Sequence, residues 1–149
     1  MPPLPNMADI SRKIVSGERE HPPVANLVGF SLTSMQEGRA AVSFEATEQH
    51  TNPMGTLQGG VLCVIADAAM ATAFASLLAD GESMITVELK INFLKPVRSA
   101  RLEAVARVIQ KGRTIGVVEC EVRDDEHNLV AHATSTCMTL TGDRPAASA

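Results

Sequence analysis

The chain has 149 residues, of which 45% are hydrophobic and 20% are charged, and this balance is typical of one compact domain and excludes an intrinsically disordered chain. Its 17 acidic residues outnumber its 13 basic residues, and the formal net charge of −4 lacks the positive excess that binds a nucleic-acid backbone. We therefore expect a single domain with no nucleic-acid partner.

The first 24 residues are predicted to form a tail and a short amphipathic helix. In "MADISRKIVSGE", Ile10, Ile14 and Val15 recur at helical spacing and Gly17 ends the pattern. This N-terminus has no basic stretch followed by an apolar core, so no secretory signal is expected and the protein is predicted to be cytoplasmic.

The following residues, 25–141, are predicted to form one domain that starts with a hairpin and a buried helix. "ANLVGFSLTSM" and "GRAAVSFEA" flank a turn that ends at Gly38, and the second segment alternates apolar with polar residues. Residues 60–79 form an apolar run long enough to suggest a membrane span. Asp67 lies near the centre of this run and strands flank it, so we expect a buried helix and no membrane partner.

Four further strands are predicted after this helix. "MITVELKINFLKP" alternates so that one face would carry Val87, Leu89, Ile91 and Phe93, and the other Thr86, Glu88, Lys90 and Asn92. "ARLEAVARVIQ", "RTIGVVECEVRD" and "NLVAHATSTCMTL" are separated by turn residues, so we expect these strands to be antiparallel neighbours. Residues 142–149 are predicted to be a loose tail.

The long apolar helix determines the expected architecture. A helix that is apolar nearly all round must be covered on most of its circumference. A curved antiparallel sheet wrapped around the helix does this with few residues and leaves its other face to water or to another subunit. The predicted fold class is therefore α+β.

Asp67 is the residue in this helix that needs an explanation. It could be a carboxylate that points out of a helix end, but Val64, Ile65, Ala66 and Ala68 surround it in the sequence. Burial of a carboxylate without a partner is costly, so its position inside an apolar run favours a functional role.

The sequence resembles a known family, the hotdog-fold acyl-CoA thioesterases, in the PaaI-like branch that is related to 4-hydroxybenzoyl-CoA thioesterases. The resemblance covers residues 25–141 and rests on "NPMGTLQGG", on Asp67, on "TVELKINFLKPV" and on "KGRTIGVVECEVRDDEHNLVAHATSTC". Many relatives have histidine before the paired glycines, where this chain has Gln58. An amide at that position can donate and accept hydrogen bonds but does not titrate like an imidazole.

The resemblance implies hydrolysis of an acyl- or aryl-CoA thioester, with Asp67 as nucleophile or general base. It also implies that the N–H of Gly59 is the oxyanion donor, and free N–H groups at a helix start can stabilise negative charge on a thioester oxygen. The glycines could instead relieve crowding where the helix meets the sheet. Asn52, which could simply be a turn residue, and Thr86 match positions that orient Asp67 or a water molecule.

The spacing of Gly59 and Asp67 predicts a dimer. Eight residues of helix span about 12 Å, whereas reacting atoms must approach to about 3–3.5 Å. If both residues serve one thioester, they come from different chains, and a two-fold axis would give two equivalent shared sites. The family resemblance implies the same dimer and allows a tetramer.

Five residues match positions where the family binds the CoA part of its substrate, although each could be an ordinary surface residue. They are Lys95, Arg98, Lys111, Gly112 and Arg113. Basic side chains at these positions would make charge-assisted contacts with phosphates.

The sequence predicts no metal and no cofactor beyond CoA as part of the substrate. The four histidines do not have HxxxH or HExxH spacing, and the three cysteines are far apart, as expected for buried side chains in a reducing compartment. The alternative functions are a non-catalytic acyl-CoA binding or sensing module and a hydratase. A sensor usually needs an output domain, and a hydratase would need a histidine soon after Asp67.

Overall fold

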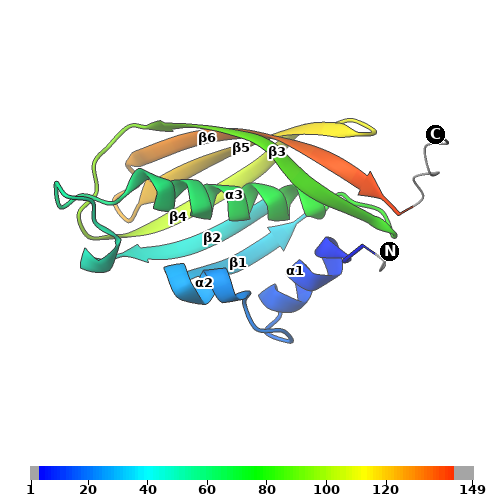
Figure 1. The fold of residues 1–149 in the computed structure, drawn as a ribbon, viewed down its shortest axis with the longest axis horizontal. Helices are drawn as coiled ribbons and strands as arrows, with labels where there is room; N and C mark the ends of the chain where they lie inside the picture. The colour runs from blue at the N-terminus through cyan, green and yellow to red at the C-terminus, as the bar shows by residue number, and fades with distance from the viewer. Residues whose placement is uncertain (1–3, 143–149) are drawn as a thin grey trace, which may run out of the picture.

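The computed structural model describes residues 4–142. Along the chain it contains three α-helices, one short 3-10 helix and six strands (Figure 1). These elements are α1 (Met7–Val15), α2 (Pro23–Val28), β1 (Phe30–Gln36), β2 (Arg39–Ala46), η1 (Glu48–His50), α3 (Gly59–Ala75), β3 (Glu82–Phe93), β4 (Ala100–Lys111), β5 (Ile115–Asp124) and β6 (Leu129–Thr141).

The six strands form one antiparallel sheet in the order β1-β2-β4-β5-β6-β3. The sheet curves around α3, and α1 and α2 lie beside β1 at its lower edge (Figure 1). The predicted α+β architecture, with a curved sheet around a long helix, is therefore confirmed.

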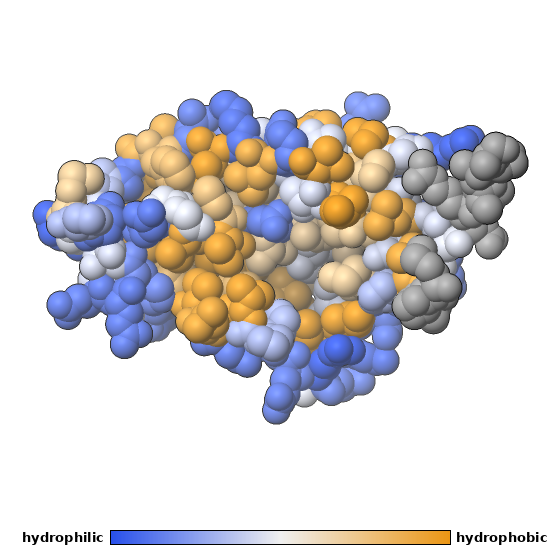
Figure 2. Space-filling view, in the orientation of Figure 1, coloured by the Kyte–Doolittle hydropathy of each residue, from blue (hydrophilic) through white to orange (hydrophobic). Residues whose placement is uncertain are grey.

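Helix α3 packs against the sheet through one side only. Ile65, Met70 and Phe74 have no exposed surface, and the alanines beside them bring the helix backbone close to the strands. Asp67 and Ala71 lie on the opposite side and are only half-buried. Figure 2 shows hydrophobic side chains gathered on the face along which α3 runs. The sheet thus leaves part of this apolar helix uncovered.

The prediction that residues 25–28 belong to a strand is wrong, because these residues lie in α2. Pro23 occupies the first turn of this helix, where its fixed φ is helical and where an N–H group would have no partner inside the helix. Gly29 ends the helix with a left-handed φ of 93°, and its N–H donates to the oxygen of Ala25. Strand β1 therefore begins only at Phe30.

The predicted alternation of β3 is interrupted by a bulge between Thr86 and Glu88. Before the bulge Thr86 faces α3, and after it Leu89 and Ile91 pack against the core. Val87 is exposed, so it does not share a face with Leu89 as predicted. An extra residue in one strand reverses the side-chain alternation beyond it, and this is why Thr86 and Leu89 face the same way.

Strands β4, β5 and β6 are consecutive antiparallel neighbours, as predicted, but β3 pairs with β6 and not with β4. β1 and β3 are consequently the two edges of the sheet. The predicted tail at 142–149 lies, apart from its first residue, outside the described residues. Within residues 4–142, no helix is long and apolar enough to cross a membrane.

Asp124 organises the turn between β5 and β6. Its carboxylate accepts hydrogen bonds from the backbone N–H groups of Glu126 and Asn128 and from the Asn128 amide, and it forms a 2.6 Å ion pair with Lys95. The bond from Lys95, followed by that from Asn128, holds the pKa of Asp124 well below its usual range.

We predict that Asp124→Asn lowers the free energy of unfolding at pH 7 and that this loss shrinks as the pH falls. The lowered pKa means that the carboxylate stabilises the fold above the pKa of an unfolded aspartate, about 4, and that this contribution disappears as acid protonates the folded group. Urea unfolding of both proteins between pH 7 and pH 3 measures the difference, and a difference independent of pH would contradict the prediction.

Candidate active site

Asp67 lies two turns into α3 and is half-buried. The hydroxyl of Thr86 on β3 donates a 2.9 Å hydrogen bond to its Oδ1. The other oxygen, Oδ2, accepts no hydrogen bond from any residue that the structure describes. One oxygen of the carboxylate is therefore oriented by a neighbour while the other is available to a ligand.

A cavity of about 860 Å³ opens beside Asp67. α3 contributes Val64, Asp67, Ala68, Ala71 and Thr72, which recur at helical spacing along one side of the helix. The remaining wall comes from β1, β2 and the N-terminal segment, and most of it is apolar. Asp67 is thus a carboxylate at the side of a largely apolar cavity.

Two cysteines lie near Asp67, but neither is a good nucleophile. Burial raises the pKa of the Cys63 thiol, and the negative charge of Asp67 raises it further. Burial likewise raises the pKa of Cys137, to which Asp67 adds a smaller effect. Since the thiolate is the nucleophilic form of cysteine, both side chains are held in their unreactive state at neutral pH.

The N-terminus of α3 has no side-chain cap. Gln58 occupies the N-cap position, but its exposed side chain makes no capping hydrogen bond, and the first turn contains no acidic residue. The N–H groups of Gly59 and Gly60 have no partner inside the helix. Such a helix start can donate hydrogen bonds to an oxygen that carries negative charge.

The two glycines at this helix start differ in their surroundings. The ring of Phe93 packs on Gly59 so closely that an added Cβ would lie 2.8 Å from the ring. An added Cβ on Gly60 would meet nothing within 4 Å. Glycine at residue 59 thus lets the Phe93 ring lie against the helix backbone, whereas Gly60 leaves open space at the surface of the helix.

The loop before α3 is held by Asn52 and His50. The Oδ1 of Asn52 accepts hydrogen bonds from the N–H groups of Met54 and Thr56, and its Nδ2 donates to the Thr56 hydroxyl at 2.9 Å. His50 hydrogen-bonds through both ring nitrogens, to Thr47 and to the oxygen of Val28. Asn52 therefore stabilises the turn, and within one chain it lies away from Asp67.

A second cavity, of about 430 Å³, lies at this helix start. Its wall includes Asn52, Gly59, Phe93 and Lys95, but not Asp67 or Thr86. The predicted catalytic residues thus form two groups in one chain: Asp67 with Thr86 beside one cavity, and Gly59 with Asn52 beside the other.

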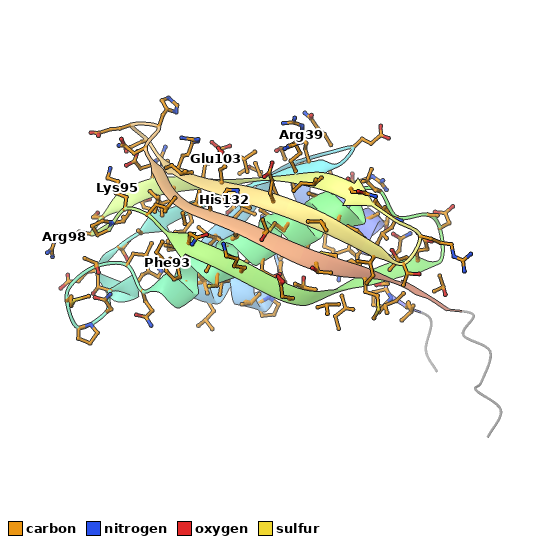
Figure 3. All side chains as sticks on the ribbon, turned by 90° about the horizontal axis from the view of Figure 1, so that it is seen from above. Arg39, Phe93, Lys95, Arg98, Glu103 and His132 are labelled. Carbon is orange, nitrogen blue, oxygen red and sulfur yellow. The ribbon has the colours of Figure 1, made fainter. Side chains whose placement is uncertain are left out.

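The basic residues predicted to contact CoA also divide into two groups. Lys95 and Arg98 lie with Phe93 at one end of the sheet (Figure 3), where Lys95 pairs with Asp124 and Arg98 donates to the oxygen of Gly55 at 3.3 Å. Neither side chain is engaged with Asp67.

The second basic group lies at the β4–β5 hairpin, near the C-terminal turn of α3. The Lys111 ammonium lies 5.7 Å from the centre of the Phe74 ring, a cation–π distance. The N–H of Gly112 donates to the oxygen of Ile115, and Arg113 is exposed. The two basic groups thus lie towards opposite ends of the same helix.

Among residues 4–142, no three histidine, cysteine, aspartate or glutamate side chains are placed to hold a metal ion.

The sequence did not predict that Phe93 is a neighbour of Gly59 or that the N-terminal segment is part of the cavity at Asp67. Phe93 ends an alternating strand directly before Leu94, and both are more than half exposed. Nothing in the sequence of the N-terminal segment indicated a cavity, because only the fold brings it to α3.

The sequence model of the Thioesterase superfamily matches residues 54–131, which is more than half of the chain. The chain is 32% identical to the acyl-coenzyme A thioesterase PaaI of Escherichia coli over 113 residues, 75% of this chain and 79% of that one. It is 34% identical to a Saccharolobus solfataricus protein named as an esterase over 115 residues, 76% of this chain and 75% of that one.

Solved structures agree with these matches. A phenylacetic acid degradation-related protein from Ralstonia eutropha superimposes with a TM-score of 0.79 at 33% identity, covering 87% of this chain and 98% of that one. The E. coli PaaI structure gives a TM-score of 0.79 at 26% identity, covering 91% and 97%. The chain belongs to the thioesterase superfamily, with the hotdog fold of its PaaI-like branch, and is a thioester hydrolase.

Proposed function

We propose that this protein hydrolyses acyl-CoA thioesters to the free acid and CoA, with Asp67 acting on the thioester carbonyl. The observation that carries the proposal is the Asp67 carboxylate itself. One of its oxygens accepts a 2.9 Å hydrogen bond from Thr86, the other accepts none from residues 4–142, and the side chain lines a largely apolar cavity. A carboxylate that is held in one orientation can meet the carbonyl carbon in the geometry that the reaction requires.

Two chemical roles of Asp67 are consistent with this placement. As a nucleophile, Oδ2 bonds to the carbonyl carbon while the carbon–sulfur bond breaks and CoA leaves as a thiolate; water then cleaves the acyl-aspartate anhydride. As a general base, Oδ2 takes a proton from water while the water oxygen attacks the same carbon. In both roles the Thr86 hydroxyl orients the carboxylate and does not itself react.

The oxyanion donor in this proposal is the N–H of Gly59 in a second copy of the chain. Asp67 and Gly59 line different cavities of one chain and are about 12 Å apart along α3, too far to act on one carbonyl. The uncovered side of α3 and the unpaired edge of β3 provide surfaces for a second copy. Antiparallel packing of two α3 helices about a two-fold axis would place each Asp67 beside the partner's helix start.

This dimer gives each group of predicted residues a role. The helix start with Gln58, Gly59 and Asn52 offers polar groups to the thioester, and Gln58 supplies an amide instead of an imidazole. Lys95 and Arg98 lie at that same end of the chain. In an antiparallel dimer, the partner's Lys111 hairpin would approach this end, so that both basic groups serve one CoA.

We propose further that hydrolysis needs no metal or other cofactor, since a carboxylate and a helix N-terminus supply the attacking and stabilising groups. The cytoplasm is the proposed location. Its reducing conditions suit three cysteines that form no disulfide in the structure, with Cys120 and Cys137 fully buried.

Replacement of Asp67 tests the catalytic proposal. We expect Asp67→Asn to lower kcat at least about 100-fold, because the amide can neither attack nor accept the proton. Thr86→Val should lower kcat about 10-fold through loss of orientation alone. Release of free thiol from a panel of acyl-CoA substrates measures both effects, with and without a metal chelator.

Asp80→Asn is the matched control, since Asp80 is an exposed carboxylate just beyond α3. Its rate should equal that of the wild type, and the chelator should change no rate. Full activity of Asp67→Asn would refute the catalytic role of Asp67. Tight acyl-CoA binding without any turnover by the wild type would instead indicate the non-catalytic binding module.

Cys63 provides a test of the shared site. Residue 63 is midway between residues 59 and 67, so the proposed two-fold axis passes beside Cys63 on the uncovered side of α3. Helix axes about 9–10 Å apart would leave the two facing Cys63 Cα atoms about 4.4–5.4 Å apart, within the range of about 4.4–6.8 Å that a disulfide allows.

We therefore predict that mild oxidation, at a pH high enough to form the thiolate, links two chains through Cys63. Non-reducing electrophoresis should show a dimer band that disappears in Cys63→Ser, because Cys120 and Cys137 are fully buried. A protein that is dimeric by light scattering but gives no Cys63 cross-link would show that the α3 helices do not meet in this way.

A further inference from the structure

The N-terminal segment, residues 4–24, forms one whole side of the cavity at Asp67. α1 contributes Met7, Ile10 and Ile14 to the wall, and the stretch after α1 contributes residues 19–24. The other side consists of α3 and the strands β1 and β2. The segment therefore bounds one side of a cavity that is partly open to solvent.

The N-terminal segment is attached firmly enough to act as a wall. α1 contacts both β1 and α3, and Ala8, Ser11 and Ile14 on one side of it are buried. Nε2 of His21 accepts a 3.0 Å hydrogen bond from the backbone N–H of Leu32 on the edge strand β1. The segment is therefore fixed to the sheet at α1 and again at His21.

The position of Asp67 indicates which part of a thioester enters this cavity. The carbonyl carbon that reacts with Asp67 carries the acyl group on one side and the sulfur of CoA on the other, so both groups must leave Asp67 in different directions. The wall of the cavity at Asp67 is mainly aliphatic. The cavity at the helix start is also largely apolar, but Asp67 does not line it, and it lies at the end of the chain that carries Lys95 and Arg98. An apolar wall suits an acyl chain better than the amide-containing arm of CoA, because buried amides need hydrogen-bond partners.

We propose that the cavity bounded on one side by the N-terminal segment is the acyl-binding pocket and that it selects aliphatic acyl groups of medium to long chain. This inference rests on the proposed acyl-CoA hydrolysis at Asp67. The volume of about 860 Å³ is far larger than a short acyl group needs, and Phe30 is the one phenyl ring among the described wall residues. Arg19 and Glu20 are exposed at its mouth, so a long chain can extend towards solvent.

Ile10 and Met7 are the residues that test the pocket, because both are half-buried on α1 and line its wall. Ile10→Trp and Met7→Trp would each fill part of the pocket. Each methylene group of the acyl chain that no longer fits in the pocket lowers the binding affinity about four-fold. We therefore expect each variant to lower the ratio of kcat/KM for dodecanoyl-CoA to kcat/KM for acetyl-CoA at least ten-fold.

Val15→Trp is the matched control, since Val15 lies on the same helix but is exposed and does not line the cavity. Its ratio should equal that of the wild type. Thermal unfolding of each variant identifies any that fail to fold.

Product inhibition tests the pocket in the wild-type protein, without any substitution. Dodecanoate should compete with the substrate, and acetate should not.

The outcomes separate this inference from the proposed function. Three results would each overturn the pocket assignment while hydrolysis at Asp67 stands. The first is an active wild type whose substrate ratio is unchanged in all folded variants. The others are faster turnover of phenylacetyl-CoA than of dodecanoyl-CoA, and no competition by dodecanoate. Failure of the wild type to hydrolyse any of these substrates would overturn the proposed function, and the pocket assignment with it.

Discussion

Helix α3 imposes the constraint on which the rest of the structure depends, because it is apolar around nearly its whole circumference and one sheet can cover only part of it. The six strands curve around the side that carries Ile65, Met70 and Phe74, and none of these side chains is exposed. The uncovered side must be buried by something else. In this chain the N-terminal segment covers part of it, and the remainder is the surface on which the proposed shared site depends.

The candidate active site uses two irregularities of otherwise regular elements. The bulge in β3 turns the Thr86 hydroxyl towards α3, where it meets Asp67. The start of α3 lacks a side-chain cap, which leaves backbone donors free next to Gly59. A regular strand would have pointed Thr86 away from the helix, and a capped helix would have satisfied the donors. Both departures interrupt a regular element, and in the proposed mechanism they place polar groups beside the thioester.

In the proposed function, catalysis and substrate selection depend on different parts of the chain. The family match covers residues 54–131, which contain Asp67, Gly59 and Thr86. The N-terminal segment that lines the cavity lies outside that match. Changes in α1 can therefore alter the size of the cavity without altering the carboxylate or the helix start, which is a physical basis for one catalytic arrangement with different acyl preferences.

The sequence by itself determined the long buried helix, the hairpin turn at Gly38 and the three consecutive strands after residue 100, because hydrophobic period and turn residues are local properties. It also identified Asp67, as a lone acid in an apolar run. Residues 25–28 are helical because of the local signals of Pro23 and Gly29, which the apolar pattern around them concealed. Only the tertiary structure decided that β3 pairs with β6 and that Val87 and Leu89 face opposite ways. It also decided that the N-terminal segment reaches Asp67. These features depend on contacts between residues distant in sequence, and a local pattern contains no information about which distant partner it will meet.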